Sequence, residues 1–317
     1  MAFHSETTLN PVKARVPRRL RAPAALRVGV RPRGMGPAMA LSLLPALLLF
    51  LVFYAVPIAM LVGTAFTDWN VAGVSWLGLA NFRELLADDV FWKAARNTLY
   101  YSAAGVFAQV PLGVVAGVLL ARRLPGWKIF RALLFIPTVI SGAAFALTYG
   151  MLYNADYGLL NSALGVVGLD RGHDWLFDTS TALPAVALTF VIMVGFTLIL
   201  VMAEIAAVPG ELYEAAQLDG ATVLQRERFI TLPALRNIIG TCVLLSLLFT
   251  LKLFDVVFVM TSGGPADATS TLGTYTYTAY ANNDWGYANA VGVLTLLLGL
   301  VVIVGTRRLF GMGEPDA

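Results

Sequence analysis

The chain has 317 residues, of which 58% are hydrophobic and only 13% are charged, and its mean hydropathy is +0.75. A soluble protein carries about 25% charged residues, so this composition excludes an ordinary soluble enzyme and favours an integral membrane protein. The net charge of +3 indicates little until the positions of the charged residues relative to the membrane are known. We expect no nucleic-acid partner. Two histidines and one cysteine are too few and too scattered to indicate a metal site.

Residues 1–37 are rich in arginine and proline and show no hydrophobic pattern. We therefore expect this tail to be disordered and cytoplasmic. It does not resemble a secretory signal, because the apolar stretch that follows it is too long.

Long runs without charged residues predict the membrane spans, since a span needs about 20 largely apolar residues. The sequence therefore predicts an all-α membrane protein with a six-helix transmembrane domain over residues 38–310 and a short cytoplasmic C-terminus, 311–317. The fifth span is long enough only if it continues through Lys252 and Asp255 to Met260. The six expected spans are 34–67, 97–121, 132–155, 179–203, 237–260 and 285–306.

The distribution of lysine and arginine predicts the orientation of these spans. The tails and the loops on their side of the membrane carry 17 of these residues, and the opposite loops carry four. We expect both termini to be cytoplasmic.

Several catalytic and channel signatures are absent. No Gly-x-x-x-x-Gly-Lys-Ser/Thr loop is present, so this chain is not expected to bind ATP by that route. The sequence also lacks His-Glu-x-x-His and Gly-x-Ser-x-Gly, and it contains no filter-like repeat of the kind that channels use. We expect no catalytic residues, no metal and no cofactor.

The loop at 204–237, between the fourth and fifth spans, reads as two short helices. Pro209 suits the first turn of a helix, and Gly220 can end that helix in a left-handed turn. Thr222 and Gln225 have the spacing of a capping box for a second helix, and Pro233 marks the start of span five. Small residues in this loop would let a partner protein approach closely, although an ordinary amphipathic loop has the same pattern.

The same loop carries the pattern Glu-Ala-Ala-x3-Gly-x9-Ile-x-Leu-Pro. This pattern resembles the EAA motif of binding-protein-dependent ABC importer permeases, whose coupling helices dock into the ATPase subunit. The resemblance implies an ATPase-coupling role for Glu214, Ala215, Ala216, Gly220, Ile230, Leu232 and Pro233. Leu224 and Glu227 depart from the sugar-permease pattern, in which Trp and Phe are frequent at these positions.

Other segments resemble the first permease subunit of carbohydrate importers of the maltose, lactose and glycerol-phosphate type. Among them are Phe135-Ile136-Pro137 in the third span and the Thr-x-Gly-Gly-Pro turn after the fifth. The resemblance implies four kinds of partner: a second permease subunit, two ATPase subunits that bind the ATP, an extracytoplasmic solute-binding protein, and the lipid bilayer.

Lys252 and Asp255 are charged residues inside the fifth span, where charge is costly unless it faces protein or water. Their i, i+3 spacing predicts a pair on one helical face. One interpretation is that they brace an outer gate together with Gly263, Gly264 and Pro265. The other is that they are interfacial anchors. The run 269–281, rich in Thr, Tyr and Ala, fits either a vestibule or an interfacial aromatic belt.

The resemblance predicts a permease subunit in the inner membrane of a bacterium. This subunit would form part of the membrane translocation pathway for a sugar or sugar-like solute. A polyol or glycerol phosphate is also compatible with it. The alternative is an ion-coupled secondary transporter, but only the fifth span carries internal charges, and we find no repeat. A membrane-embedded enzyme would need an acid–base or metal constellation that this sequence lacks.

Overall fold

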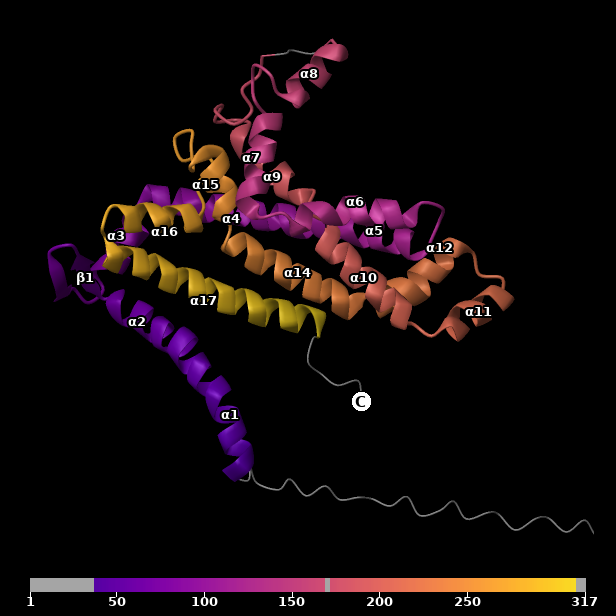
Figure 1. Cartoon of the computed structure of the whole chain (residues 1–317), viewed down its shortest axis with the longest axis horizontal. Helices are drawn as coiled ribbons and strands as arrows, with labels where there is room; N and C mark the ends of the chain where they lie inside the picture. Colours follow the sequence, from indigo (N-terminus) through magenta and orange to yellow (C-terminus); the bar gives the residue numbers. More distant parts are fainter. Residues whose placement is uncertain (1–36, 169–171, 312–317) are drawn as a thin grey trace, which may run out of the picture. The chain divides into compact units, whose positions relative to one another are not determined.

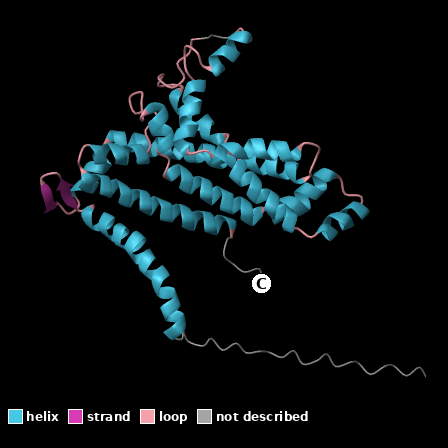
Figure 2. Cartoon of the chain, viewed as in Figure 1, coloured by secondary structure: helices cyan, strands magenta, loops and turns pink. Residues whose placement is uncertain are grey.

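The computed structural model describes residues 37–168 and 172–311, which are mainly helical with one short β-hairpin (Figure 2). The predicted disorder of residues 1–37 and the predicted C-terminal segment, 311–317, lie outside the described residues apart from their inner edges. The sequence analysis did not predict the hairpin. Its strands pair antiparallel around Val71 and Ala72, where the Asn70 side chain accepts a hydrogen bond from the Ala72 N–H.

The chain divides into two compact units, which meet between Tyr54 and Ala55. In the described part of the first unit, every side chain from Leu41 to Tyr54 is exposed. The second unit contains the helix bundle (Figure 1). The elements up to the second span are α1 (Pro37–Phe50), η1 (Leu51–Ala55), α2 (Val56–Thr64), β1 (Thr67–Asn70), β2 (Gly73–Trp76), α3 (Ala80–Ala87), α4 (Asp89–Ala104), η2 (Gly105–Gln109) and α5 (Val110–Ala121).

The elements of the third and fourth spans follow, and then the 209–235 segment, which we name by its residue numbers. The chain ends with the fifth and sixth spans. These elements are α6 (Trp127–Val139), α7 (Gly142–Leu152), α8 (Leu159–Val166), α9 (Ala182–Val191), α10 (Gly195–Ala207), α11 (Gly210–Leu218), α12 (Val223–Arg226), η3 (Glu227–Thr231), α13 (Leu232–Ala234), α14 (Arg236–Leu251), α15 (Asp255–Thr261), α16 (Leu272–Ala281) and α17 (Trp285–Phe310).

Four helices among the described residues are long and apolar enough to cross a membrane, and two bent helix pairs raise the number to six if each counts as one span. This agrees with the six predicted spans. The second span begins earlier than predicted, at Asp89, because the Asp88 side chain caps α4 and the helix tolerates Lys93 and Arg96 near its exposed start. The third span is sharply bent, with 106° between α6 and α7.

The prediction that the fifth span continues as one helix through Lys252 and Asp255 is wrong. Helix α14 ends at Leu251, and α15 begins only at Asp255. The helical face that was to bring Lys252 and Asp255 together therefore does not exist, because an i, i+3 relation requires an unbroken helix.

Three π-helical turns interrupt the helices, and each ends two residues before a proline. Proline has no N–H, and its ring clashes with the carbonyl oxygen four residues earlier. In each case that carbonyl belongs to the π turn, whose wider backbone relieves the clash. The pairs are η1 with Pro57, η2 with Pro111 and η3 with Pro233.

Helices α5 and α10 pack so closely that two glycines are required between them. A Cβ atom on Gly113 would lie 2.6 Å from the Thr197 Cβ, and one on Gly117 would lie 2.7 Å from a Val201 methyl carbon. The Gly-x-x-x-Gly spacing puts both on one helix face, as in tightly packed membrane helices. Helices α5 and α10 are therefore held at short range over about one turn.

Candidate functional site

The 209–235 segment folds as the sequence predicts, into two short helices joined at a left-handed glycine. Pro209 is the N-cap of α11, and Gly220 has a φ of +78° just after that helix. The side chains of Thr222 and Gln225 form the predicted capping box at the start of α12. The local pattern was sufficient here because each of these signals acts within one turn of the chain.

Most of the predicted coupling residues lie on the surface of this segment. Glu214, Ala215 and Gly220 are exposed, as are Leu232 and Pro233, whereas Ala216 and Ile230 are half-buried. Large apolar side chains are also exposed, and such a surface is typical of a docking site for another protein. The most exposed of them are Leu218, Leu224 and Phe229.

One ion pair fastens this segment to the bundle. Arg122, at the end of α5, donates a hydrogen bond from Nη2 to Glu227 Oε1 at 3.1 Å. Within the segment, the Tyr213 hydroxyl lies 3.0 Å from that of Thr231, which joins α11 to η3. These residues line a cavity of about 340 Å³, together with Arg226, whose Nε is buried and has no hydrogen-bond partner.

A second cavity, of about 330 Å³, lies between the second, third, fourth and fifth spans. None of its lining side chains carries a charge. Gln109 crosses it, donating from Nε2 to the Met193 carbonyl oxygen at 3.0 Å and accepting from the Ser246 hydroxyl at 2.9 Å. The lining residues are Gln109, Phe135, Thr138, Met193, Phe196, Thr197, Cys242, Leu245, Ser246 and Phe249.

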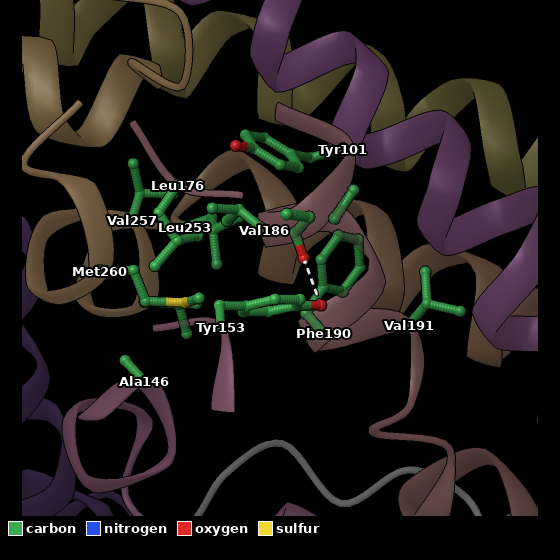
Figure 3. Packing of buried hydrophobic residues seen from close by; sticks show 13 residues of the cluster. Tyr101, Ala146, Tyr153, Leu176, Val186, Phe190, Val191, Leu253, Val257 and Met260 are labelled. Atoms are coloured by element: carbon green, nitrogen blue, oxygen red, sulfur yellow. Dashed lines mark hydrogen bonds between the residues drawn. The ribbon is translucent and has the colours of Figure 1, made fainter. Parts of the chain in front are cut away.

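A cluster of buried apolar residues is shown in Figure 3. It adjoins this cavity on the side away from the 209–235 segment. Chain order establishes the side. In the second and fourth spans, which run toward the segment, Tyr101 and Phe190 precede the cavity residues; in the third and fifth, which run away from it, Tyr153 and Leu253 follow them. The Tyr153 hydroxyl donates to the Ala185 carbonyl oxygen at 3.1 Å. Apolar side chains therefore pack next to the cavity at this end.

The predicted gate residues do not form one group. Lys252 and Asp255 are both exposed, and the only ion pair among residues 37–168 and 172–311 is that of Arg122 with Glu227. The Asp255 carboxylate instead lies against Gly142, where a Cβ atom would be 3.2 Å from Oδ2. It thus sits at the start of both α7 and α15, where the helix dipoles favour an anion.

Gly263, Gly264 and Pro265 form the turn after α15, as expected of Gly-Gly-Pro. Gly263 has a φ of +88°, and its carbonyl oxygen accepts the Thr269 N–H at 3.1 Å. The Thr269 hydroxyl donates to the Gly264 carbonyl oxygen at 2.8 Å. The turn is therefore held by its own loop rather than by Lys252 or Asp255.

The sequence analysis missed the residue that anchors this loop, Asn97. Its Nδ2 donates to the carbonyl oxygens of Ala268 and Ser270, each at 3.0 Å, and the side chain is buried. Neighbouring Thr98 accepts the Leu272 N–H at 3.0 Å. A buried asparagine in an otherwise apolar span is the signal that identifies such an anchor, because a buried amide needs partners.

A third cavity, of about 520 Å³, opens at the end away from the 209–235 segment, between the hairpin, α3 and α16. Its lining is acidic and includes Glu84, Asp88 and Asp284. The Tyr275 hydroxyl donates to Asp88, and burial together with this carboxylate raises the pKa of Tyr275 far above its usual value. Tyr275 is therefore a hydrogen-bond donor at every physiological pH.

Comparison with known proteins gives a family match over residues 110–311, to the model described as "Binding-protein-dependent transport system inner membrane component". The probable ABC transporter permease protein YurN of Bacillus subtilis is 34% identical over 285 residues, covering 87% of this chain and 97% of the relative.

The trehalose/maltose transport system permease protein MalF of Thermococcus litoralis is 31% identical over 266 residues, which cover 82% of this chain and 89% of that protein. Among solved structures, a bacterial ABC transporter involved in the import of the acidic polysaccharide alginate has a chain that superimposes with a TM-score of 0.78. The identity is 24%, and the coverage is 87% of this chain and 96% of that one. This likeness concerns the fold.

Proposed function

Since the chain belongs to the family of binding-protein-dependent transport system inner membrane components, we propose that it forms part of the membrane pathway of an ATP-driven importer for a neutral sugar. The single observation that carries the choice of substrate is the uncharged cavity between four spans. The chain is a multi-pass membrane protein, and its role as a permease subunit agrees with the expected absence of catalytic residues.

The orientation follows from the excess of lysine and arginine on the side of the 209–235 segment. In this arrangement the segment faces the cytosol and the acidic 520 Å³ cavity faces outward. The apolar cluster around Tyr153 and Phe190 then lies on the outer side of the cavity between the spans.

The chemistry of the cavity favours a neutral sugar over an acidic one. Its polar groups are the amide of Gln109 and the hydroxyls of Thr138, Thr197 and Ser246, which suit sugar hydroxyls. Aromatic rings such as Phe249 offer apolar faces for packing against a sugar ring. A carboxylate or phosphate would have no cation to pair with there, and an unpaired buried charge is costly.

The proposed assembly contains a second permease subunit, two ATPase subunits and an extracytoplasmic binding protein. The apolar surface of the 209–235 segment supports docking of an ATPase subunit. ATP would be bound by those subunits, because this chain lacks a phosphate-binding Gly-Lys-Ser/Thr loop. Lipid and the second permease would cover the exposed apolar faces of the spans.

The ion-coupled alternative receives no support from the comparisons. Such transporters place ionisable groups at the substrate site. Here the described cavity between the spans is uncharged, and Lys252 and Asp255 lie apart from it.

The test is uptake by the assembled transporter in liposomes, with radiolabelled maltose, trehalose and diacetylchitobiose as neutral probes and an alginate oligosaccharide as the acidic one. We expect ATP-dependent import of a neutral probe only. Phe249→Ala should raise the KM for that probe by about threefold or more, since it removes an aromatic contact. Phe107→Ala is the matched control, because its ring is 80% exposed and does not line the cavity. Import driven by an ion gradient without ATP would refute the proposal.

A further inference from the structure

Few polar side-chain contacts attach the 209–235 segment to the bundle. Among the described residues, the Arg122–Glu227 pair is the only side-chain hydrogen bond or ion pair that joins this segment to a different span. The other side-chain hydrogen bonds of the segment, such as that of Tyr213 with Thr231, stay within it. Leu235, at the end of the segment, also packs in one apolar cluster with Val110 and Val114 of α5, so the ion pair is the polar part of the connection between the segment and α5.

The surroundings of the Arg122–Glu227 pair favour its formation. The side chains of Arg122 and Glu227 are 39% and 22% exposed, and they line the 340 Å³ cavity under the segment. Glu227 lies in η3, the π turn before Pro233, and Arg122 caps the C-terminus of α5. Arg122 also lies where the dipole of α5 favours a cation. The neighbouring Arg123 faces the Trp127 ring instead, at 5.9 Å from its centroid.

From Arg122, the contact path continues to the cavity between the spans. Gly113 lies nine residues before Arg122, roughly 14 Å along α5. The Gly113–Thr197 and Gly117–Val201 contacts leave no room for α5 to slide against α10 without a clash. Thr197 itself lines the uncharged cavity. The close packing of α5 on α10 therefore connects Arg122 to residues of both helices that lie at the cavity.

We propose that Arg122 and Glu227 are positioning residues that transmit movement of the 209–235 segment through the interlocked helices α5 and α10 to the sugar cavity. This inference rests on the proposed function, and it assigns the link between ATP hydrolysis and transport to one ion pair. Glu227 stands where the resembling sugar permeases frequently have Phe, so an ion pair here takes the place of an aromatic contact.

The experiment measures the number of sugar molecules imported per ATP hydrolysed, in liposomes that contain the complete transporter. The probe is whichever of maltose, trehalose and diacetylchitobiose the wild type imports fastest. The variants are Arg122→Ala, Glu227→Ala and the charge-swapped Arg122→Glu/Glu227→Arg. Arg123→Ala is the control, since it removes an equal charge one residue away. Co-purification of the ATPase subunits reports assembly.

We expect both single variants to assemble and to hydrolyse ATP, with import per ATP lowered about two- to fivefold, the range that a partly exposed ion pair supplies. The swapped variant should recover part of this loss, since it restores the pair but places an anion at the C-terminus of α5. Arg123→Ala should match the wild type. Unchanged coupling in the single variants, no recovery in the swapped variant, or loss of the ATPase subunits would each overturn the inference and leave the proposed function standing. Failure of the wild type to import any probe would overturn both.

Discussion

Buried polar side chains in this protein find partners inside the bundle, and they determine how its spans are joined. Gln109 bridges the second, fourth and fifth spans, and Asn97 fastens the loop after α15. Hydrogen bonds between membrane helices contribute about 0.6 kcal/mol on average, so their main effect is to select one packing arrangement among several apolar ones.

At Gly220 in the 209–235 segment, a small and a large side chain are expected to have different effects. Its φ of +78° strains any residue with a Cβ atom, at a cost of about 1 kcal/mol, but no atom lies within 4 Å of that position. We expect Gly220→Ala to assemble with the ATPase subunits and to transport. We expect Gly220→Trp to reach the membrane but to lose them, because its ring projects into the docking surface.

The measurement is co-purification of the ATPase subunits, with the amount of membrane-inserted chain as the control for folding. Normal transport by Gly220→Trp would show that this glycine lies outside the contact with the ATPase.

Helix breaks determine how the chain packs at the end of the bundle away from the 209–235 segment. The third and fifth spans are each interrupted, and their second halves, α7 and α15, pack together with Asp255 at the start of both. The apolar cluster at this end takes five of its 13 buried residues from α9 and four from α7 and α15.

This geometry changes what is expected of Lys252 and Asp255. As residues on either side of a break, they should act independently, so the swapped variant Lys252→Asp/Asp255→Lys should transport no better than the poorer single variant. Asp255→Ala should lower the stability by about 0.3–1 kcal/mol, because it removes an anion from helix N-termini. Thermal unfolding and uptake of the two single variants and the swap provide the measurement. Rescue by the swap would mean that the two charges pair during transport.

The π turns predict an unusual tolerance to deletion. A π turn contains about one residue more than an α turn, so removing one exposed residue restores an α-helix without rotating either flank. We expect deletion of Phe107 combined with Pro111→Ala to keep the packing of α5 on α10 and the level of assembly. Deletion of Leu99, which is also exposed, with the same proline change should abolish assembly because it rotates α4 by about 100°.

The comparison is read from the yield of assembled transporter, with Pro111→Ala alone as the reference. Equal loss in both deletion variants would mean that η2 is needed for its shape rather than tolerated because of Pro111.

Much of the apolar surface of the spans is not covered by the chain itself. Apolar side chains remain exposed along most spans, and the window of the first span contains no buried residue. Surfaces of this kind are stable only against lipid or another protein. We therefore expect this chain to work as part of a larger assembly in the membrane.

It follows that the purified chain should hydrolyse no ATP, and that hydrolysis should appear only after the ATPase subunits are added. The reason is the missing Gly-Lys-Ser/Thr loop, without which the phosphates have no cradle of backbone N–H groups. Phosphate release from the chain alone and from the assembled transporter provides the measurement. Hydrolysis by the chain alone, in a preparation free of ATPase subunits, would contradict the permease role.

The amino-acid pattern is sufficient to predict the spans, the two short helices of the 209–235 segment and the left-handed turn at Gly220. Each of these depends on the transfer of apolar residues into lipid or on hydrogen bonds within one turn, and such effects are encoded in neighbouring residues. The motif at Glu214–Pro233 likewise led to the family, which the comparisons confirmed.

The pairing of Glu227 with Arg122, the anchoring by Asn97 and the separation of Lys252 from Asp255 could not be predicted in the same way. Each depends on which helices lie side by side or on where a helix breaks, and the partners of Asn97 lie about 170 residues away. Hydropathy does not distinguish a broken span from a continuous one, because both bury the same apolar side chains. Only the packing of α15 against α7 and α9 decides that the chain bends at Lys252.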